Sequence, residues 1–201
     1  MKKLFLMGCL LSFAVVLFSC STTPKVTRVA DDELIDLSGN WNDSDSKLVA
    51  DEMIADSLSK PWLSSFMMKK QAKPRIIVGT ILNKSDEHIS TETFTKDLEI
   101  ALLNSGTVSF VASKDQRVEI RDERSDQADF SDPKTVKKFG KELGADYMLK
   151  GQINTITDAA GKTTLKYYQT ELELIDIETN EKVWIGQKKI KKVVGRSKYK
   201  A

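Results

Sequence analysis

The thiol of Cys20 is the side chain whose surroundings in this sequence most clearly favour a covalent reaction. Lys2 and Lys3 precede a near-continuous apolar run, Leu4–Phe18, and polar sequence follows Cys20 at once. A basic start, a short apolar run and a small residue before the cut are typical of a secretory signal peptide. The run has 15 residues, fewer than the ~20 that a helix needs to cross a bilayer. We therefore predict cleavage before Cys20 and export of the chain.

Cys20 directly follows Ser19, which resembles the signal of bacterial lipoproteins, in which the thiol takes up a diacylglycerol before cleavage. Phe18 departs from that pattern, because a small residue is more common there. The alternative is an uncleaved membrane anchor. The resemblance implies a mature protein that begins at Cys20 and carries fatty acyl chains such as palmitate. Two or more chains hold a protein stably at a membrane, because each buried methylene contributes ~0.8 kcal/mol.

The charge balance of the mature chain argues against nucleic acid as a partner. Cleavage removes Lys2 and Lys3 from the 31 basic residues, which leaves 29 basic against 29 acidic residues. Without net positive charge, the electrostatic attraction on which nucleic-acid binding depends is missing. The second cysteine, Cys9, leaves with the signal peptide, so the exported domain must be held together by packing without disulfides.

The other polar residues offer little for catalysis or cofactor binding. His88 is the single histidine, whereas zinc sites need several His or Cys ligands and a Ser-His-Asp site needs a serine on a rigid turn. His88 therefore fits a solvated loop residue better. Glu171 and Glu173 share one face of a predicted strand, with no apolar pocket to separate their pKa values for acid–base work. We predict a protein that is not an enzyme, with no cofactor, no metal and no small-molecule substrate.

Cap residues and periodicity divide the rest of the chain into helices and strands. Asn42 and Asp43 suit the start of a helix, which Pro61 ends before it begins another. Ser113 and Gln116 predict a capping box at the start of a highly charged helix. The predicted helices cover residues 42–60, 61–67, 91–105, a stretch from 113, and 131–144. The predicted strands cover residues 74–82, 108–111, 145–154, 163–177 and 182–186.

This order of elements predicts a single α/β (α+β-like) domain, with a mixed sheet of about four to five strands flanked by helices. The last three strands form a meander, and the alternation of apolar residues changes parity near Ile175. A β-bulge or burial of both faces would explain that change. We divide the chain into a signal peptide over 1–19, a lipid-anchored tether over 20–33, a globular domain over 34–192 and a basic C-terminal tail over 193–201.

Four stretches carry a resemblance to a known family: Leu37–Asp43, Val78–Ser85, Gly144–Gly151 and Leu174–Trp184. Together with the lipid signal, they resemble the LpoB-type activators of penicillin-binding proteins from about residue 34 to about 192. The third stretch is less specific, because curli-secretion lipoproteins and the amino-terminal domain of TolB are similar there. The first stretch discriminates better. The resemblance implies a fold similar to that TolB domain.

The resemblance also implies an outer-membrane lipoprotein that faces the periplasm. In that family a non-catalytic domain docks on a bifunctional peptidoglycan synthase, a class A penicillin-binding protein, and raises its glycosyltransfer and transpeptidation rates. An alternative is a structural lipoprotein of an envelope assembly, such as a secretion or flagellar apparatus, that uses the same domain. A third is an enzyme that acts on cell-wall glycan through a carboxylate pair, for which the sequence lacks the constellation.

The tether is shorter than in the best-known members of that family, which carry a long Pro-rich segment. Some 10–15 residues lie between Cys20 and the first apolar sequence, and at ~3.3–3.6 Å per residue they span on the order of 40–50 Å when extended. The partner-binding residues are not assigned by the sequence.

Two residue groups have both a structural and a functional interpretation. Trp41, Trp62 and Trp184 could bind a partner, but burial in the core is the more frequent role, above all for Trp184 in a strand. The lysine-rich run from Lys188 to Lys200 is predicted to be a solvated end, with attraction to anionic lipid or cell-wall polymer as the alternative.

Overall fold

The computed structural model describes residues 26–30, 33–137 and 140–195. Residues from Leu34 onward form one compact unit, and its first helix, α2 (Asp43–Leu58), begins at the predicted cap. The Asn42 side chain accepts a hydrogen bond from the Asp45 N–H, and the Asp45 carboxylate accepts one from the Asn42 N–H, each at 3.0 Å. Helix α3 (Pro61–Lys70) follows, with proline at its first position, where no backbone N–H is needed.

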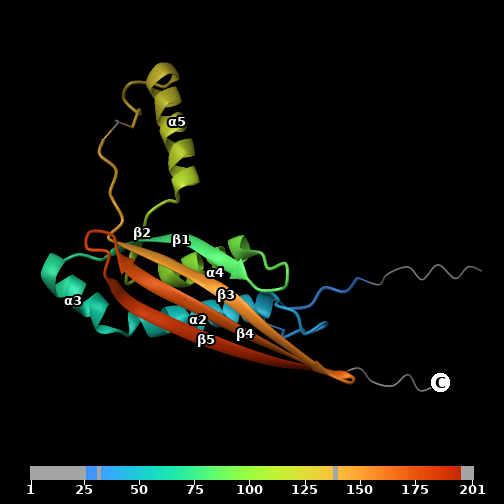
Figure 1. Cartoon of the computed structure of the whole chain (residues 1–201). Helices are drawn as coiled ribbons and strands as arrows, with labels where there is room; N and C mark the ends of the chain where they lie inside the picture. Colours follow the sequence, from blue (N-terminus) through green and yellow to red (C-terminus); the bar gives the residue numbers. More distant parts are fainter. Residues whose placement is uncertain (1–25, 31–32, 138–139, 196–201) are drawn as a thin grey trace, which may run out of the picture. The chain divides into compact units, whose positions relative to one another are not determined.

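The sheet has five strands: β1 (Arg75–Lys84), β2 (Ser109–Phe110), β3 (Tyr147–Ala160), β4 (Thr163–Asp176) and β5 (Lys182–Gly195). Their spatial order is β2-β1-β3-β4-β5. Strand β1 pairs in parallel with β2 and β3, whereas β3, β4 and β5 form an antiparallel meander (Figure 1). The sheet is therefore mixed, and the predicted α+β domain is confirmed.

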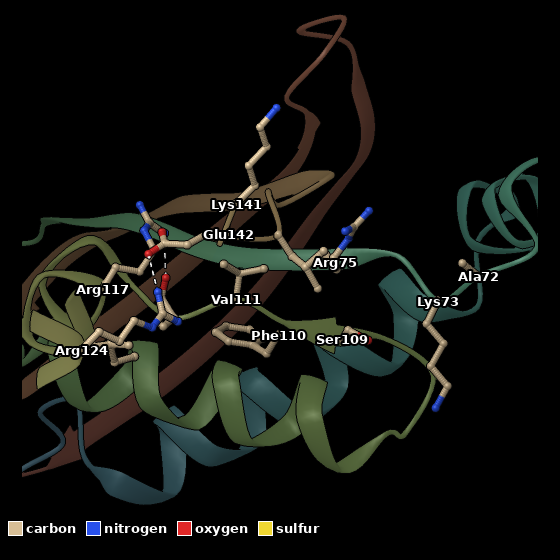
Figure 2. A pocket seen from close by; sticks show the side chains of 13 residues that line it. Ala72, Lys73, Arg75, Ser109, Phe110, Val111, Arg117, Arg124, Lys141 and Glu142 are labelled. Atoms are coloured by element: carbon tan, nitrogen blue, oxygen red, sulfur yellow. Dashed lines mark hydrogen bonds and ion pairs between the residues drawn. The ribbon is translucent and has the colours of Figure 1, made fainter. Parts of the chain in front are cut away.

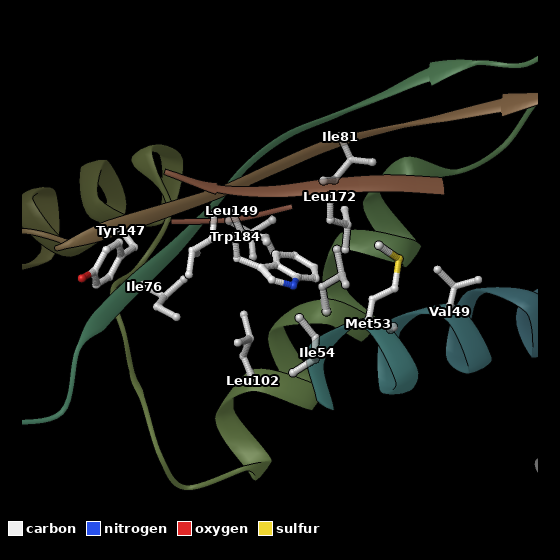
Figure 3. Packing of buried hydrophobic residues seen from close by; sticks show 14 of the residues in the cluster. Val49, Met53, Ile54, Ile76, Ile81, Leu102, Tyr147, Leu149, Leu172 and Trp184 are labelled. Atoms are coloured by element: carbon white, nitrogen blue, oxygen red, sulfur yellow. The ribbon is translucent and has the colours of Figure 1, made fainter. Parts of the chain in front are cut away.

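The hydrophobic core lies between this sheet and the helices α2 and α4 (Thr91–Asn104). Helix α4 buries Phe94, Leu98 and Leu102 on one face, as the helical spacing of these residues predicts. Helix α2 contributes Val49, Met53 and Ile54, which meet the strand residues of the sheet (Figure 3). The opposite face of the sheet bears polar side chains from β3, β4 and β5.

Helix α5 (Lys114–Phe130) has the predicted capping box between Ser113 and Gln116. None of the residues that the structure describes along this helix is buried, and Figure 1 shows α5 extending away from the sheet. An isolated helix of this length is only marginally stable in water. The contacts at its base are therefore important for its position.

The helix predicted over residues 131–144 is wrong in its described part. Asp132 and Pro133 do start a turn, because the Asp132 carboxylate accepts the Lys134 N–H at 3.0 Å. Residues 133–135 form this turn, but residues 136–137 and 140–144 are not helical. Leu143, an apolar residue near the end of the predicted helix, is 69% exposed, so it supplies little of the packing that stabilises helices in proteins. Residues 138–139 lie outside the described part.

The meander is longer than predicted. A register shift lies between Leu174 and Ile175 in the pairing of β4 with β5, and it leaves Val183 of β5 without a partner residue. The bulge therefore lies on β5, while β4 pairs with β3 without a shift and keeps the same face buried through Leu174. Turns with positive φ at Gly161 and Asn180 connect the strands. Strand β5 runs to Gly195, past residue 192, so the first lysines of the basic run lie in a strand and not in a solvated tail. Residues 196–201 lie outside the described part.

We predict that Gly151→Ala destabilises the domain by about 1–3 kcal/mol, the usual cost of overpacking a well-packed site. A Cβ at Gly151 would overlap the backbone carbonyl oxygen of Glu171 on the paired strand, so β3 and β4 would have to separate. Urea unfolding followed by tryptophan fluorescence measures the effect. The matched control is Gly195→Ala, where nothing lies within 4 Å of the added atom. Equal midpoints for the two variants would contradict the prediction.

Candidate functional site

The residues that sequence patterns offered for catalysis belong to two parts of the fold, a loop and one face of the sheet. His88 is exposed in the loop between β1 and α4. Glu171 lies on the polar face of the sheet, where hydrogen bonds from Gln152 and Gln169 hold the pKa of its carboxyl below the usual value. Glu173 lies on the same face and pairs with Lys182 at 2.7 Å. This places Glu171 as an ionised surface carboxylate, and not as a general acid.

The three tryptophans have structural roles. Trp62 and Trp184 are buried, and their indole N–H groups donate to the Ser57 carbonyl at 2.7 Å and to the Asp56 carboxylate at 2.9 Å. Trp41 is half-buried and lies edge-on to two aromatic rings, with its indole N–H donated to Ser46 Oγ at 2.7 Å. The burial predicted for these side chains is therefore confirmed for Trp62 and Trp184 and partly for Trp41.

A polar network holds the segment before α2 on the ends of strands β4 and β5. We call it the N-terminal clasp, and it consists of Asp36, Gly39, Asn40, Trp41, Asp45, Glu87, Lys166, Tyr168 and Lys192. At one end the Lys192 ammonium lies 2.6 Å from Asp45 and 2.9 Å from Asp36, and it donates to the Asn40 carbonyl at 3.1 Å. The Lys192 side chain is only 8% exposed, although the sequence presented it as part of a solvated lysine run.

At the other end of the clasp, the Glu87 carboxylate accepts three hydrogen bonds. Lys166 Nζ and the Tyr168 hydroxyl donate to its Oε1, each at 2.7 Å, and the Trp41 backbone N–H donates to its Oε2 at 3.1 Å. Lys166 also contacts the Asn40 side chain. The clasp therefore ties the loop after β1, the segment before α2 and the last two strands to one another.

The charges of the clasp are stabilised as ions. Burial raises the pKa of Glu87, but hydrogen bonds from Lys166, Tyr168 and the Trp41 N–H outweigh it, so that pKa lies below its usual value. Burial and the bond to Glu87 raise the pKa of the Tyr168 hydroxyl, which stays protonated. Burial lowers the pKa of Lys192, but its bonds to Asp45 and Asp36 reverse the shift.

The clasp explains why particular residue types occur in the stretch Leu37–Asp43. Gly39 has a φ of +72°, and a side chain there would overlap Val194 of β5. Its carbonyl oxygen lies 3.1 Å from the Tyr168 hydroxyl. Glycine, Trp41 and the helix cap Asn42 are thus each required by the docking of this segment on the sheet. Sequence reasoning found the stretch but missed Glu87, Lys166 and Lys192, whose partners are far away along the chain.

A second feature is an open groove at the base of α5, which we call the α5 groove. It has a volume of about 790 Å³. Its lining comes from the start of β1, from β2 and the loop after it, from α5 and from the segment before β3: Ala72, Lys73, Arg75, Ser109, Phe110, Val111, Ala112, Arg117, Ile120, Arg124, Lys141, Glu142 and Leu143. Figure 2 shows Phe110 and Val111 in the centre of this group, with charged side chains around them.

Ion pairs fix the walls of the α5 groove. Arg121 donates to both oxygens of Glu142, at 3.0 and 2.8 Å, and Arg124 donates to the same carboxylate at 3.2 Å. These bonds join α5 to the segment before β3. They also hold the pKa of Glu142 below its usual value, and the bond from Arg121 has the largest effect. On the opposite wall Arg75 is paired with Asp146 at 3.2 Å.

The lipid attachment predicted at Cys20 lies outside the described residues, as does the predicted signal peptide. Among the residues that the structure describes, no helix has the length and apolar character needed to cross a membrane. In the same part of the chain, no group of three or more His, Cys, Asp or Glu side chains could bind a metal ion.

The sequence matches the family model described as peptidoglycan-synthase activator LpoB over residues 45–190. No curated protein matches the sequence. Solved structures with a similar fold include the LpoB C-terminal domain from Escherichia coli, at 16% identity and a TM-score of 0.46, with 73% of this chain and 98% of that chain covered.

Two further solved structures are similar at lower TM-scores. The NMR structure of E. coli LpoB has 14% identity and a TM-score of 0.43, with 90% of this chain and 87% of that chain covered. Lipoprotein GNA1162 from Neisseria meningitidis has 15% identity and a TM-score of 0.38, with 63% and 88% covered.

We predict that Glu87→Gln lowers the free energy of unfolding by about 1–3 kcal/mol at pH 7, because the Lys166 and Tyr168 partners lose an ionised acceptor. The pKa of Glu87 is lowered on folding, so its contribution is complete above the unfolded value of about 4.3 and is lost as the pH falls through the folded pKa. The gap between wild type and variant should therefore close in acid.

Urea unfolding at a series of pH values measures that gap. Glu178→Gln, at an exposed position in the turn between β4 and β5, is the control and should differ little from wild type throughout. A constant gap between pH 7 and pH 3 would show that the charge of Glu87 is not what stabilises the clasp.

Proposed function

Because the chain belongs to the LpoB family of peptidoglycan-synthase activators, we propose that it binds and activates a bifunctional synthase, a class A penicillin-binding protein, without catalysing a reaction itself. The family match over residues 45–190 is the observation that carries this proposal. It covers both the helices on the sheet and the meander. The proposed role is regulation of cell-wall synthesis from the outer membrane, on its periplasmic side.

The structure supports a role in docking. The clasp holds the start of the domain against its last strands, so the domain can present a surface of fixed shape. The α5 groove and the polar face of the sheet are two surfaces on which a partner could bind. An activator of this kind must bind the active conformation of the synthase more tightly than the idle one, because equal affinity would leave the equilibrium unchanged.

The proposed attachment is a lipid anchor at Cys20, with residues 20–33 as the tether and the compact unit from Leu34 onward, which includes β5 as far as Gly195, as the docking domain. An anchored activator is confined to the membrane surface, which raises its effective concentration for any synthase within reach of the tether. The short tether requires the synthase to come within on the order of 40–50 Å of that membrane.

We predict that the full-length protein, purified in detergent, stimulates glycan polymerisation by the synthase of the same cell severalfold. The reason is that binding shifts the synthase toward its active conformation. Polymer formation from lipid-linked substrate, followed on gels, measures the rate, and co-purification measures the complex. Heat-denatured protein is the control. An unchanged rate together with no detectable complex would rule out the proposed function.

We predict that Cys20→Ser abolishes lipid labelling and releases the protein from the membrane fraction. The serine cannot form the thioether to the diacylglycerol, and without acyl chains the membrane affinity is lost. Metabolic labelling with an alkyne palmitate analogue, followed by fractionation, measures both effects. The matched control is Cys9→Ser, because Cys9 lies in the apolar run of the leader. This variant should be labelled normally. Equal labelling of both variants would place the lipid elsewhere.

A further inference from the structure

The α5 groove is a surface whose shape and charge suit a specific kind of partner. We infer that the α5 groove receives a segment of the synthase that carries carboxylates around an apolar tip. This inference rests on the proposed function and names the part of the domain through which it would act. Three properties of the groove support it: an excess of cations on its rim, an apolar floor, and walls that are already held in place.

The rim of the groove has five cationic side chains and one carboxylate, Glu142. Two of the cations are already paired, Arg75 with Asp146 and Arg124 with Glu142. Arg117 donates to the Ala112 carbonyl at 2.7 Å. In the part of the chain that the structure describes, no carboxylate lies within ion-pairing distance of Lys73, Arg117 or Lys141. These three positive charges therefore favour an acidic partner.

The floor of the groove is apolar and partly open to solvent. Phe110 and Val111 are half-buried at its centre, Ile120 on α5 is 42% exposed, and Leu143 is 69% exposed. Leu143 and Ile120 lie on opposite sides, on the segment before β3 and on α5. Apolar side chains that remain exposed inside a cavity bury little area in the free protein. They therefore contribute the most binding free energy when a partner covers them. The volume of about 790 Å³ falls in the range of binding pockets, ~300–1,000 Å³.

The walls of the groove need little ordering on binding. Helix α5 would be only marginally stable on its own, but the Arg121 and Arg124 bonds to Glu142 join it to the segment before β3. The Ser113 capping box fixes its first turn. A preformed groove loses less conformational entropy when it binds, so more of the contact energy appears as affinity. The highly charged α5 is thus explained as one wall of a docking site.

The test compares charge reversal inside the groove with charge reversal outside it. We expect Lys73→Glu combined with Lys141→Glu to weaken binding to the synthase at least about tenfold and to reduce its salt dependence, because attraction becomes repulsion. The matched control is Lys84→Glu combined with Lys162→Glu, which changes the net charge equally at the other ends of β1 and β3 and should bind like wild type. All four lysines lie outside the core, so both variants should fold.

The apolar floor has a test of its own. We expect Leu143→Ser to weaken binding roughly tenfold, because the partner would bury less apolar area on a serine than on a leucine. Ile156→Ser is the control, because Ile156 is similarly exposed, at 63%, but lies on β3 away from the groove. Full-length protein in detergent micelles is used throughout, with circular dichroism to verify the fold and titration calorimetry to measure affinity.

The outcomes separate this inference from the proposed function. If wild type binds and stimulates the synthase while groove variants and controls are indistinguishable, the inference is wrong and the function stands. If wild type neither binds nor stimulates, the function itself fails. Loss of adhesion to phosphatidylglycerol vesicles in the Lys73/Lys141 variant, with synthase binding unchanged, would identify a lipid surface as the occupant and overturn the inference. Loss of a wild-type dimer in sedimentation, with synthase binding unchanged, would overturn it in favour of a second copy.

Discussion

The ion pair between Lys192 and Asp45 connects the last strand of the domain to the first turn of its first helix. Both side chains are almost fully withdrawn from water, and their atoms lie 2.6 Å apart. Buried pairs of this kind add little net stability, because the ions lose their hydration, but removal of one partner leaves an uncompensated charge. The pair therefore favours the packing of α2 against β5, and the same Asp45 oxygen also accepts the Asn42 N–H of the capping box.

The elements that the sequence predicted best are those whose information is local. The caps at Asn42 and Ser113 are each decided within one helical turn. The alternation along β3 predicts which of its side chains are buried, because a strand with one covered face admits little else. The core face of α4 follows from the spacing of Phe94, Leu98 and Leu102 in the same way.

The remaining features depend on residues that are distant in the sequence. Lys192 and Asp45 are 147 positions apart, and nothing near Lys192 distinguishes it from the solvated lysines on either side. The segment 131–144 has the cap and N-terminal proline of a helix, but α2 and α4 already cover the core face of the sheet, and Leu143 is left exposed. The α5 groove likewise depends on the pairing of Arg121 with Glu142, which brings two charged segments together only in the folded domain.

The clasp and the groove differ in how they could contribute to activation. The groove is open, with unpaired charge and uncovered apolar side chains, so it can gain contacts on binding. The clasp is saturated with internal bonds and gains nothing from a partner, but it resists deformation. A domain that yielded to either conformation of the synthase would bind both equally well and would shift no equilibrium. If the groove receives the synthase as proposed, rigidity at the clasp lets contacts made in the groove select one conformation, because the cost of misfit falls on the synthase and not on the activator.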